Sequence, residues 1–162
     1  PAILVEGEIG FIGSSSEVFQ EPLPGTAMLE QALTTPEQAL EFVKETKVDL
    51  LAPAVGNLHG IFAKMAKPRL HIDLIKEIKK VVGIPLVLHG GSGTTREDFT
   101  AAIHAGMSVV HINTEIRIAW RRGIEAGLKN SPEEIAPYKI YPAAIEEIKR
   151  VASDRLRLFN FY

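Results

Sequence analysis

The chain has 162 residues, no cysteine, and 18 Lys and Arg against 20 Asp and Glu, which gives a formal net charge of −2. This length suits one domain but is short of the roughly 250 residues of a closed eight-stranded α/β barrel. The balanced charge argues against a general nucleic-acid surface, and the lack of cysteine excludes disulfides and thiolate metal sites. No apolar run reaches membrane-spanning length and no signal peptide is evident, so we expect a cytoplasmic protein that binds neither membrane nor nucleic acid.

Short apolar runs alternate with amphipathic stretches along the chain. Strands are expected at residues 3–9, 49–55, 85–88 and 108–113. Helices are expected at residues 35–46, 73–82, about 95–106, 116–129 and 142–158, with a short additional helix beginning at Ser131. The Gly-, Ser- and Pro-rich stretch at 10–26 predicts no regular structure. Thr35 is the expected N-cap of the first helix, with Pro36 in its first turn, and Pro142 is expected to open the last.

Each expected strand is a short, continuous apolar run, which is typical of strands buried on both faces. Alternation of such strands with helices predicts a parallel sheet covered by helices. Four strand–helix units are half of a (β/α)₈ barrel. The glycine-rich and histidine-bearing segments all follow strands directly. They therefore belong to the C-terminal ends of the strands, where α/β barrels and open α/β sheets bind their ligands.

The strongest local motif is Leu-His-Gly-Gly-Ser-Gly at residues 88–93. Its glycines let the backbone approach an anion closely, and successive N–H groups form a concave nest that suits phosphate. The N-terminus of the following helix adds a positive dipole end. His89 stands at the strand tip beside this nest. The alternative is a tight glycine-rich turn with a structural histidine.

A second glycine-rich loop, Gly-Asn-Leu-His-Gly at residues 56–60, follows another apolar strand and holds His59. Neighbouring strands in a sheet lie about 4.8 Å apart, so His59 and His89 at adjacent tips can reach one metal ion. Histidine with open coordination positions is the usual arrangement of catalytic zinc. A single loop histidine is more often solvated or hydrogen-bonded. The hypothesis of a shared metal ion therefore rests on the equivalent positions of His59 and His89 after their strands.

Two strands carry polar residues at alternate positions. His111, Asn113 and Glu115 share one face of the strand expected at 108–113 and its extension. Glu6 and Glu8 share one face of the strand at 3–9, where paired carboxylates are costly unless they meet a cation or donors. For the strand with His111, the alternative is an edge strand with a polar outer face. For the strand with Glu6 and Glu8, the alternative is that this side of the strand faces the solvent.

These segments in this order resemble the class II, metal-dependent fructose-bisphosphate and tagatose-bisphosphate aldolases. The resemblance runs from about Val5 to about Trp120, and its most specific parts are the His59 and His89 motifs with the pair Thr114-Glu115. It implies the C-terminal half of a (β/α)₈ barrel. We expect one barrel segment over 1–162, with βα units over about 3–130 and C-terminal helices over 131–162.

The resemblance also implies roles for individual residues. His59 and His89 match two of three zinc-binding histidines, and Glu8 matches an acidic residue at a secondary metal position. Contacts to the substrate phosphate and to a monovalent cation, Na⁺ or K⁺, are implied for one glycine- and serine-rich set: Gly60, Gly90, Gly91 and Ser92. Asn113 and Thr114 match positions that close around the phosphate. The implied reaction is zinc-assisted cleavage of a ketose 1,6-bisphosphate to dihydroxyacetone phosphate and glyceraldehyde 3-phosphate.

The sequence departs from the family pattern at several positions. The family's first zinc histidine and the preceding acid/base aspartate have no counterpart here. Ser14 to Glu17 stand where the family has an acidic cluster, so Glu17 is the nearest substitute for its proton-transfer carboxylate. His111 replaces the usual asparagine, and we assign it to the substrate side or to a substitute metal ligand.

Three hypotheses follow for the function. In the first, the chain is half of an aldolase that is completed by an N-terminal half or by another chain. In the second, it is a half-barrel that binds a sugar phosphate or a metal without turnover. In the third, it is a different lyase or isomerase on the same barrel. In a half-barrel the terminal strands expose unpaired backbone groups and an apolar inner face, so we expect a homo-oligomer or a complementing half.

Overall fold

The computed structural model describes residues 3–13, 17–20, 33–62 and 67–160. The chain divides into two compact units, Pro1–Ile112 and Asn113–Tyr162. The first unit contains all the strands of the described residues, and the second contains two helices. The expected single barrel segment over 1–162 remains a prediction, and each unit is described by itself.

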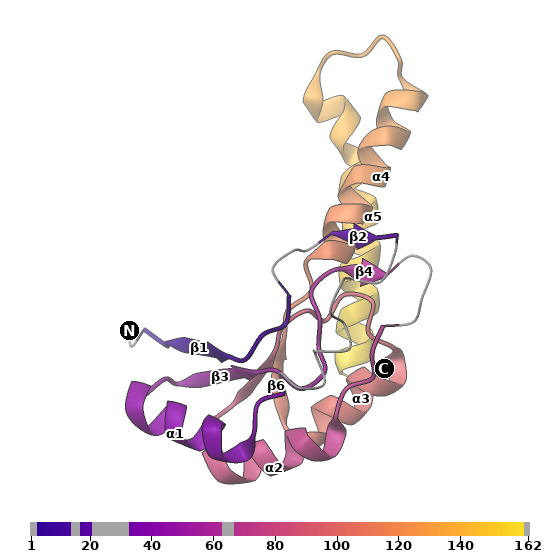
Figure 1. Ribbon diagram of the computed structural model, residues 1–162. Helices are drawn as coiled ribbons and strands as arrows, with labels where there is room; N and C mark the ends of the chain where they lie inside the picture. The colour runs from indigo at the N-terminus through magenta and orange to yellow at the C-terminus, as the bar shows by residue number, and fades with distance from the viewer. Residues whose placement is uncertain (1–2, 14–16, 21–32, 63–66, 161–162) are drawn as a thin grey trace. The chain divides into compact units, whose positions relative to one another are not determined.

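The first unit is built on a parallel sheet of four strands in the order β1-β3-β5-β6 (Figure 1). Its strands are β1 (Glu6–Ile9), β3 (Leu50–Pro53), β5 (Leu86–Leu88) and β6 (Met107–Val110). Helices α1 (Pro36–Thr46), α2 (Ile72–Val82) and α3 (Arg96–Ala105) lie side by side along one face of this sheet (Figure 1). The four parallel strands and three covering helices predicted for this region are confirmed.

The helices of this unit begin and end at residues with clear local causes. Thr35 caps α1 through a capping box with Gln38, with Pro36 in the first turn as the sequence predicts. The hydroxyl of Thr95 accepts the N–H of Asp98 and caps α3. Gly83 ends α2 in the left-handed conformation, with φ of 71°.

The two faces of the sheet differ in composition. A Cβ atom added to Gly7 would lie 2.7 Å from the ring of Phe42 in α1, so this strand position faces the helices. Neighbours in a strand point to opposite faces. Glu6 and Glu8 therefore face away from α1. The helix-covered side forms the core, and its fully buried large side chains include Leu51, Ile75, Ile78, Leu86, Leu88 and Phe99.

A small second sheet pairs β2 (Val18–Phe19) with β4 (Ile61–Phe62) in parallel. The expectation of no regular structure at 10–26 is therefore wrong for residues 18–19. Two residues of strand carry no periodic signal, and their partner lies more than forty positions away. This pairing connects the segment around Glu17 to the loop of His59, because the N–H of Ile61 donates to the carbonyl of Glu17 at 2.9 Å.

The second unit is a pair of packed helices, α4 (Thr114–Asn130) and α5 (Pro137–Phe159). Glycine allows the close approach at their contact: a Cβ atom on Gly123 would lie 2.2 Å from the Cα atom of Ala144. Arg155 of α5 pairs with Glu115 of α4 at 2.7 Å. No helix in the described part of the chain is long and apolar enough to cross a membrane.

Two expectations for this unit are wrong. Residues 131–133 form a turn where a short helix was expected, and the last helix begins at Pro137, with Pro142 inside it. Proline favours the first helical turn, and Pro137 occupies that position. The carboxylate of Glu134 accepts the N–H groups of Ile135 and Ala136 just before it. These bonds satisfy two backbone donors immediately before the helix.

Candidate metal and phosphate site

The candidate site lies on the face of the first unit's sheet that α1–α3 leave uncovered. Val87 of β5 is in register with Val109 of β6, and two positions further along each strand stand His89 and His111. Side chains two apart in an extended strand share a face. The N–H of His111 donates to the carbonyl of Leu88 at 2.9 Å, which extends the pairing past the ends of the strands. Strand alternation therefore places both histidines on one face of the sheet, just past the C-terminal ends of β5 and β6.

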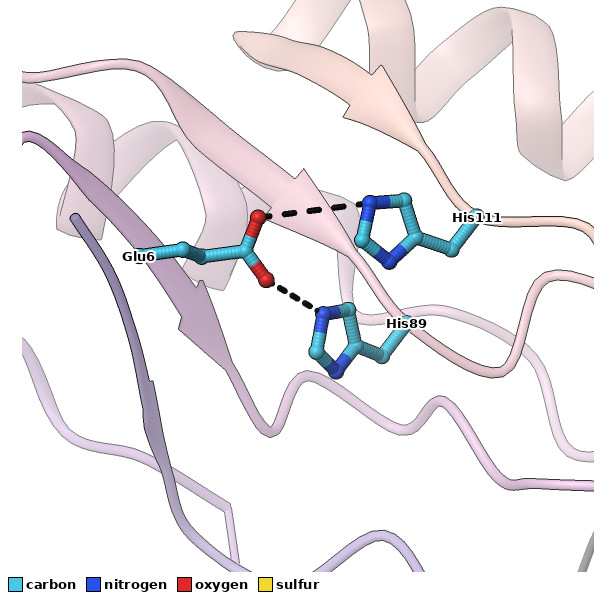
Figure 2. Close-up of side chains that lie close together, drawn as sticks. All are labelled: Glu6, His89 and His111. Carbon is cyan, nitrogen blue, oxygen red and sulfur yellow. Dashed lines mark hydrogen bonds and ion pairs between the residues drawn. The ribbon is translucent and has the colours of Figure 1, made fainter. Parts of the chain in front are cut away.

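Glu6, the first residue of β1, lies close to His89 and His111 on this face of the sheet (Figure 2). Glu6 Oε1 lies 2.7 Å from His89 Nε2, and Glu6 Oε2 lies 4.0 Å from His111 Nε2. The two imidazole rings stack with centroids 4.7 Å apart. One nitrogen or oxygen atom from each of the three residues lies within 4.8 Å of the others. Two imidazoles and a carboxylate at this spacing suit zinc and related divalent ions.

Glu8 holds the other side of the His89 ring, with Glu8 Oε2 at 2.5 Å from His89 Nδ1. Both ring nitrogens of His89 thus face carboxylates. A neutral imidazole has a single N–H and can donate to only one of them. The arrangement satisfies both carboxylates with a doubly protonated ring or with a cation on the Nε2 side. A carboxylate on the far nitrogen of a metal-binding histidine is the usual supporting contact.

His59 is near this cluster but outside it. Its ring centroid lies 6.4 Å from that of His89, with the planes tilted by 39°. Burial is the main cause of a lowered pKa for His59; Glu8 opposes the shift, and His89 and Lys67 reinforce it. The ring is therefore held toward the neutral form, which is the form that binds metals. Among the described residues, Glu6 and His111 therefore lie closer to His89 than His59 does.

The two glycine-rich loops that carry His59 and His89 are packed against each other. Asn57 accepts the N–H of Val55 at 2.8 Å and donates to the carbonyl of His89 at 3.1 Å. A Cβ atom on Gly90, where φ is 63°, would lie 2.5 Å from the carbonyl oxygen of Leu58. The N–H of Gly91 donates to the carbonyl of His111 at 3.3 Å, so this donor of the expected phosphate nest already has a backbone partner.

Lys67 was not predicted as a site residue, yet its ammonium group lies between these loops. Its Nζ atom donates to the carbonyl oxygens of Gly60 at 3.5 Å, Gly90, and Ser92 at 2.6 Å. A lysine before a proline in a loop matches no motif. Its role becomes visible only when the two loops are placed together in space.

Three other predicted residues are not members of the Glu6, His89 and His111 cluster. Glu17 is exposed next to β2. Asn113 and Thr114 belong to the second unit, where Thr114 is the first residue of α4. Glu115 was expected on an extended face with His111. That expectation is wrong, because β6 ends at Val110 and Glu115 lies in the first turn of α4.

The chain belongs to a family of metal-dependent lyases, the class II fructose-bisphosphate aldolases, whose family model matches residues 2–161. It is 32% identical to a fructose-bisphosphate aldolase of Geobacillus stearothermophilus, over 98% of this chain and 52% of that protein. It is also 32% identical to a sulfofructosephosphate aldolase of Alkalicoccus urumqiensis, over 96% of this chain and 52% of the relative.

Solved structures agree with the sequence relatives. The crystal structure of the YdjI aldolase from Escherichia coli K12 is similar with a TM-score of 0.72 and 29% identity, over 97% of this chain and 49% of that one. The predicted fold class, an α/β segment of an aldolase barrel, is confirmed. The chain spans about half the length of the curated relatives that it matches.

Proposed function

We propose that this chain supplies the metal- and phosphate-binding part of an aldolase that reversibly cleaves a ketose 1,6-bisphosphate. The substrate is fructose or tagatose bisphosphate, and the products are dihydroxyacetone phosphate and glyceraldehyde 3-phosphate. The observation that carries the proposal is the convergence of three side chains on one face of a parallel sheet: Glu6 at the start of β1, and His89 and His111 just past the C-terminal ends of β5 and β6. Family membership supplies the reaction class.

The proposed metal ligands come from three segments of this chain. His89 and His111 hold a divalent cation with Glu6, and His59 is the further candidate ligand. When bound, that cation, which we propose to be zinc, supplies Lewis acidity toward the oxygens of the ketose. Glu8, at 2.5 Å from His89 Nδ1, orients the ring so that Nε2 faces the cluster.

The phosphate end is assigned to the loop of residues 89–93. The backbone of Gly90 and the hydroxyl of Ser92 provide donors close to the following helix, α3. Phosphate contacts of Asn113 and Thr114 rest on the sequence resemblance to the family alone. These contacts orient the substrate before cleavage. Glu17 is the proposed carboxylate for proton transfer. The remaining acid/base group and metal ligand are assigned to a complementing N-terminal half.

Zinc titration of the purified, metal-free chain tests the metal part of the proposal. We expect His89→Ala to weaken binding most, with smaller losses for His111→Asn and Glu6→Gln. His104→Ala, on the exposed side of α3, is the matched control and retains the wild-type affinity. Equal zinc affinity for wild type, His89→Ala and His104→Ala would contradict the proposed ligands.

Production of dihydroxyacetone phosphate tests the reaction. It is measured for the chain alone and after mixing with the N-terminal half of the Geobacillus stearothermophilus aldolase. Fructose and tagatose 1,6-bisphosphate are compared with sulfofructose phosphate, which the name of one relative suggests. We expect zinc-dependent cleavage in the mixture and its loss with His89→Ala. Zinc binding without cleavage of any of these substrates would contradict the aldolase assignment.

The second candidate is a half-barrel that binds a sugar phosphate or metal without turnover. It is favoured by one observation, namely that Glu17, the proposed carboxylate for proton transfer, is exposed next to β2 and is not a member of the Glu6, His89 and His111 cluster. This candidate predicts that zinc and dihydroxyacetone phosphate bind to the chain and that no mixture with an N-terminal half produces cleavage.

A further inference from the structure

We propose that Lys67 is a built-in monovalent cation: its ammonium group occupies the carbonyl-lined position where Na⁺ or K⁺ is expected, and it holds the His59 and His89 loops together. The proposal rests on contacts within the first unit. It uses the proposed function only to say what the two loops do once they are held.

The ammonium group of Lys67 lies among backbone carbonyl oxygens. Lys67 Nζ donates to three backbone carbonyl oxygens, from Gly60 in one loop and from Gly90 and Ser92 in the other. Backbone carbonyls are ligands for hard monovalent and divalent cations and carry no charge of their own. Three carbonyl dipoles that point at one position repel one another unless a positive charge lies between them. An ammonium group offers that charge and three donors.

The three carbonyl oxygens around Lys67 Nζ are positioned by the fold and do not depend on Lys67 alone. Gly60 and Gly90 adopt positive φ values of 83° and 63°. An added Cβ atom would lie 2.6 Å from the carbonyl oxygen of Glu17 at Gly60, and 2.5 Å from that of Leu58 at Gly90. Glycine is therefore required at both positions, because another residue would meet backbone atoms that cannot move aside easily. The carbonyls are consequently presented by rigid, close-packed turns.

Lys67 contacts the backbone next to both loop histidines. Gly60 follows His59 directly, and Gly90 follows His89, so the ammonium group connects the backbone beside both rings. Lys67 also disfavours a positive charge on His59. A charge tethered to the chain is present at every salt composition, whereas a bound K⁺ ion is lost when the salt is exchanged. Wild-type protein should therefore be indifferent to the monovalent cation in the buffer.

Thermal melting in different chloride salts at one ionic strength tests this inference, with a chelator present and no substrate. The wild-type chain is expected to give the same Tm in potassium, sodium, ammonium and tetramethylammonium chloride. Lys67→Met is expected to lower Tm by roughly 5 °C in tetramethylammonium chloride, because a charge-assisted set of hydrogen bonds is lost. Potassium or ammonium ions should restore part of that loss in a saturable way.

Lys44→Met is the matched control, since Lys44 is an exposed lysine in the last turn of α1. It should change neither Tm nor the salt response. Lys67→Gln keeps N–H donors without charge, and it should gain the same dependence on potassium ions even if Lys67→Met does not fold. A wild-type Tm that already rises with potassium, or a Lys67→Gln protein indifferent to it, would overturn the inference. Neither result depends on zinc binding or cleavage, so the proposed function stands or falls separately.

Discussion

The two faces of the first unit's sheet are built by different rules. On the helix-covered face, apolar side chains such as Leu86 and Leu88 are fully buried, and Gly7 makes room for Phe42. On the other face, Glu6 and Glu8 of β1 lie beside His89 and His111, and all four side chains remain partly exposed. The same strands supply both sets by alternation. The helix-covered face stabilises the fold through burial. The other face also buries Val87, and in addition it holds charged groups close together.

The largest expected effect comes from the sheet edges, because β1 and β6 end the strand order of the sheet within the described residues. Ile3 and Leu4, which precede β1, are 87% and 68% exposed. Open edges and exposed apolar residues favour association. We expect the chain to self-associate with a dissociation constant near ~1 μM, equivalent to about 8 kcal/mol, as measured by sedimentation at several concentrations.

Replacing Ile3 by lysine should weaken this association, whereas Ile135→Lys, at a 92% exposed position of the second unit, should not. A compact monomer at all concentrations, with a cooperative melt, would show that the first unit tolerates its open edges. The expectation of an oligomer or a complementing half would then be wrong.

The helix-covered face is tested by Phe99→Ala. Phe99 lies in α3 and is fully buried. Removing a large core side chain should lower the free energy of unfolding by about 3–5 kcal/mol, because transfer and cavity costs add. Urea unfolding measures this loss. His111→Asn, on the opposite face, should change stability by less than about 1 kcal/mol, and a comparable loss there would mean that the open face also stabilises the fold.

The open face is tested more finely by Glu8→Gln. Glu8 contacts the Nδ1 side of His89, which points away from Glu6. Loss of a carboxylate that supports a ligand histidine typically costs about 10–100-fold in metal affinity. Zinc titration should therefore give a loss between those of Glu6→Gln and the exposed control Glu41→Gln in α1. An unchanged affinity would mean that Glu8 does not orient the ring.

The smallest expected effect concerns His59 in metal-free protein. Burial lowers its pKa below the ordinary histidine value of about 6.5. In the unfolded chain the ring takes up a proton first as pH falls. The contribution of His59 to stability is therefore complete above about pH 6.5 and decreases as pH falls toward the lowered pKa. NMR titration of the His59 ring should give a midpoint below 6.5, and a midpoint above it would contradict the burial argument.

The sequence by itself determined the parts of the fold that depend on local patterns. Continuous apolar runs predicted the four main strands, and Thr35 marked the start of α1 because caps act within a few residues. The two histidine loops were visible as motifs. The start of α5 was predicted at Pro142, but the helix begins at Pro137. Both prolines suit a first helical turn, and the carboxylate of Glu134 accepts the N–H of Ala136 just before Pro137.

Only the tertiary structure decided which of these side chains meet. Strand register and alternation bring Glu6 within 2.7 Å of His89, although 83 positions separate them in the sequence. The same holds for Lys67, whose ammonium group reaches carbonyls of two loops, and for the β2–β4 pair. Local sequence carries propensity and capping, which are short-range effects. The site is made by contacts between segments distant in sequence, and those are set by how the strands pair and the loops pack.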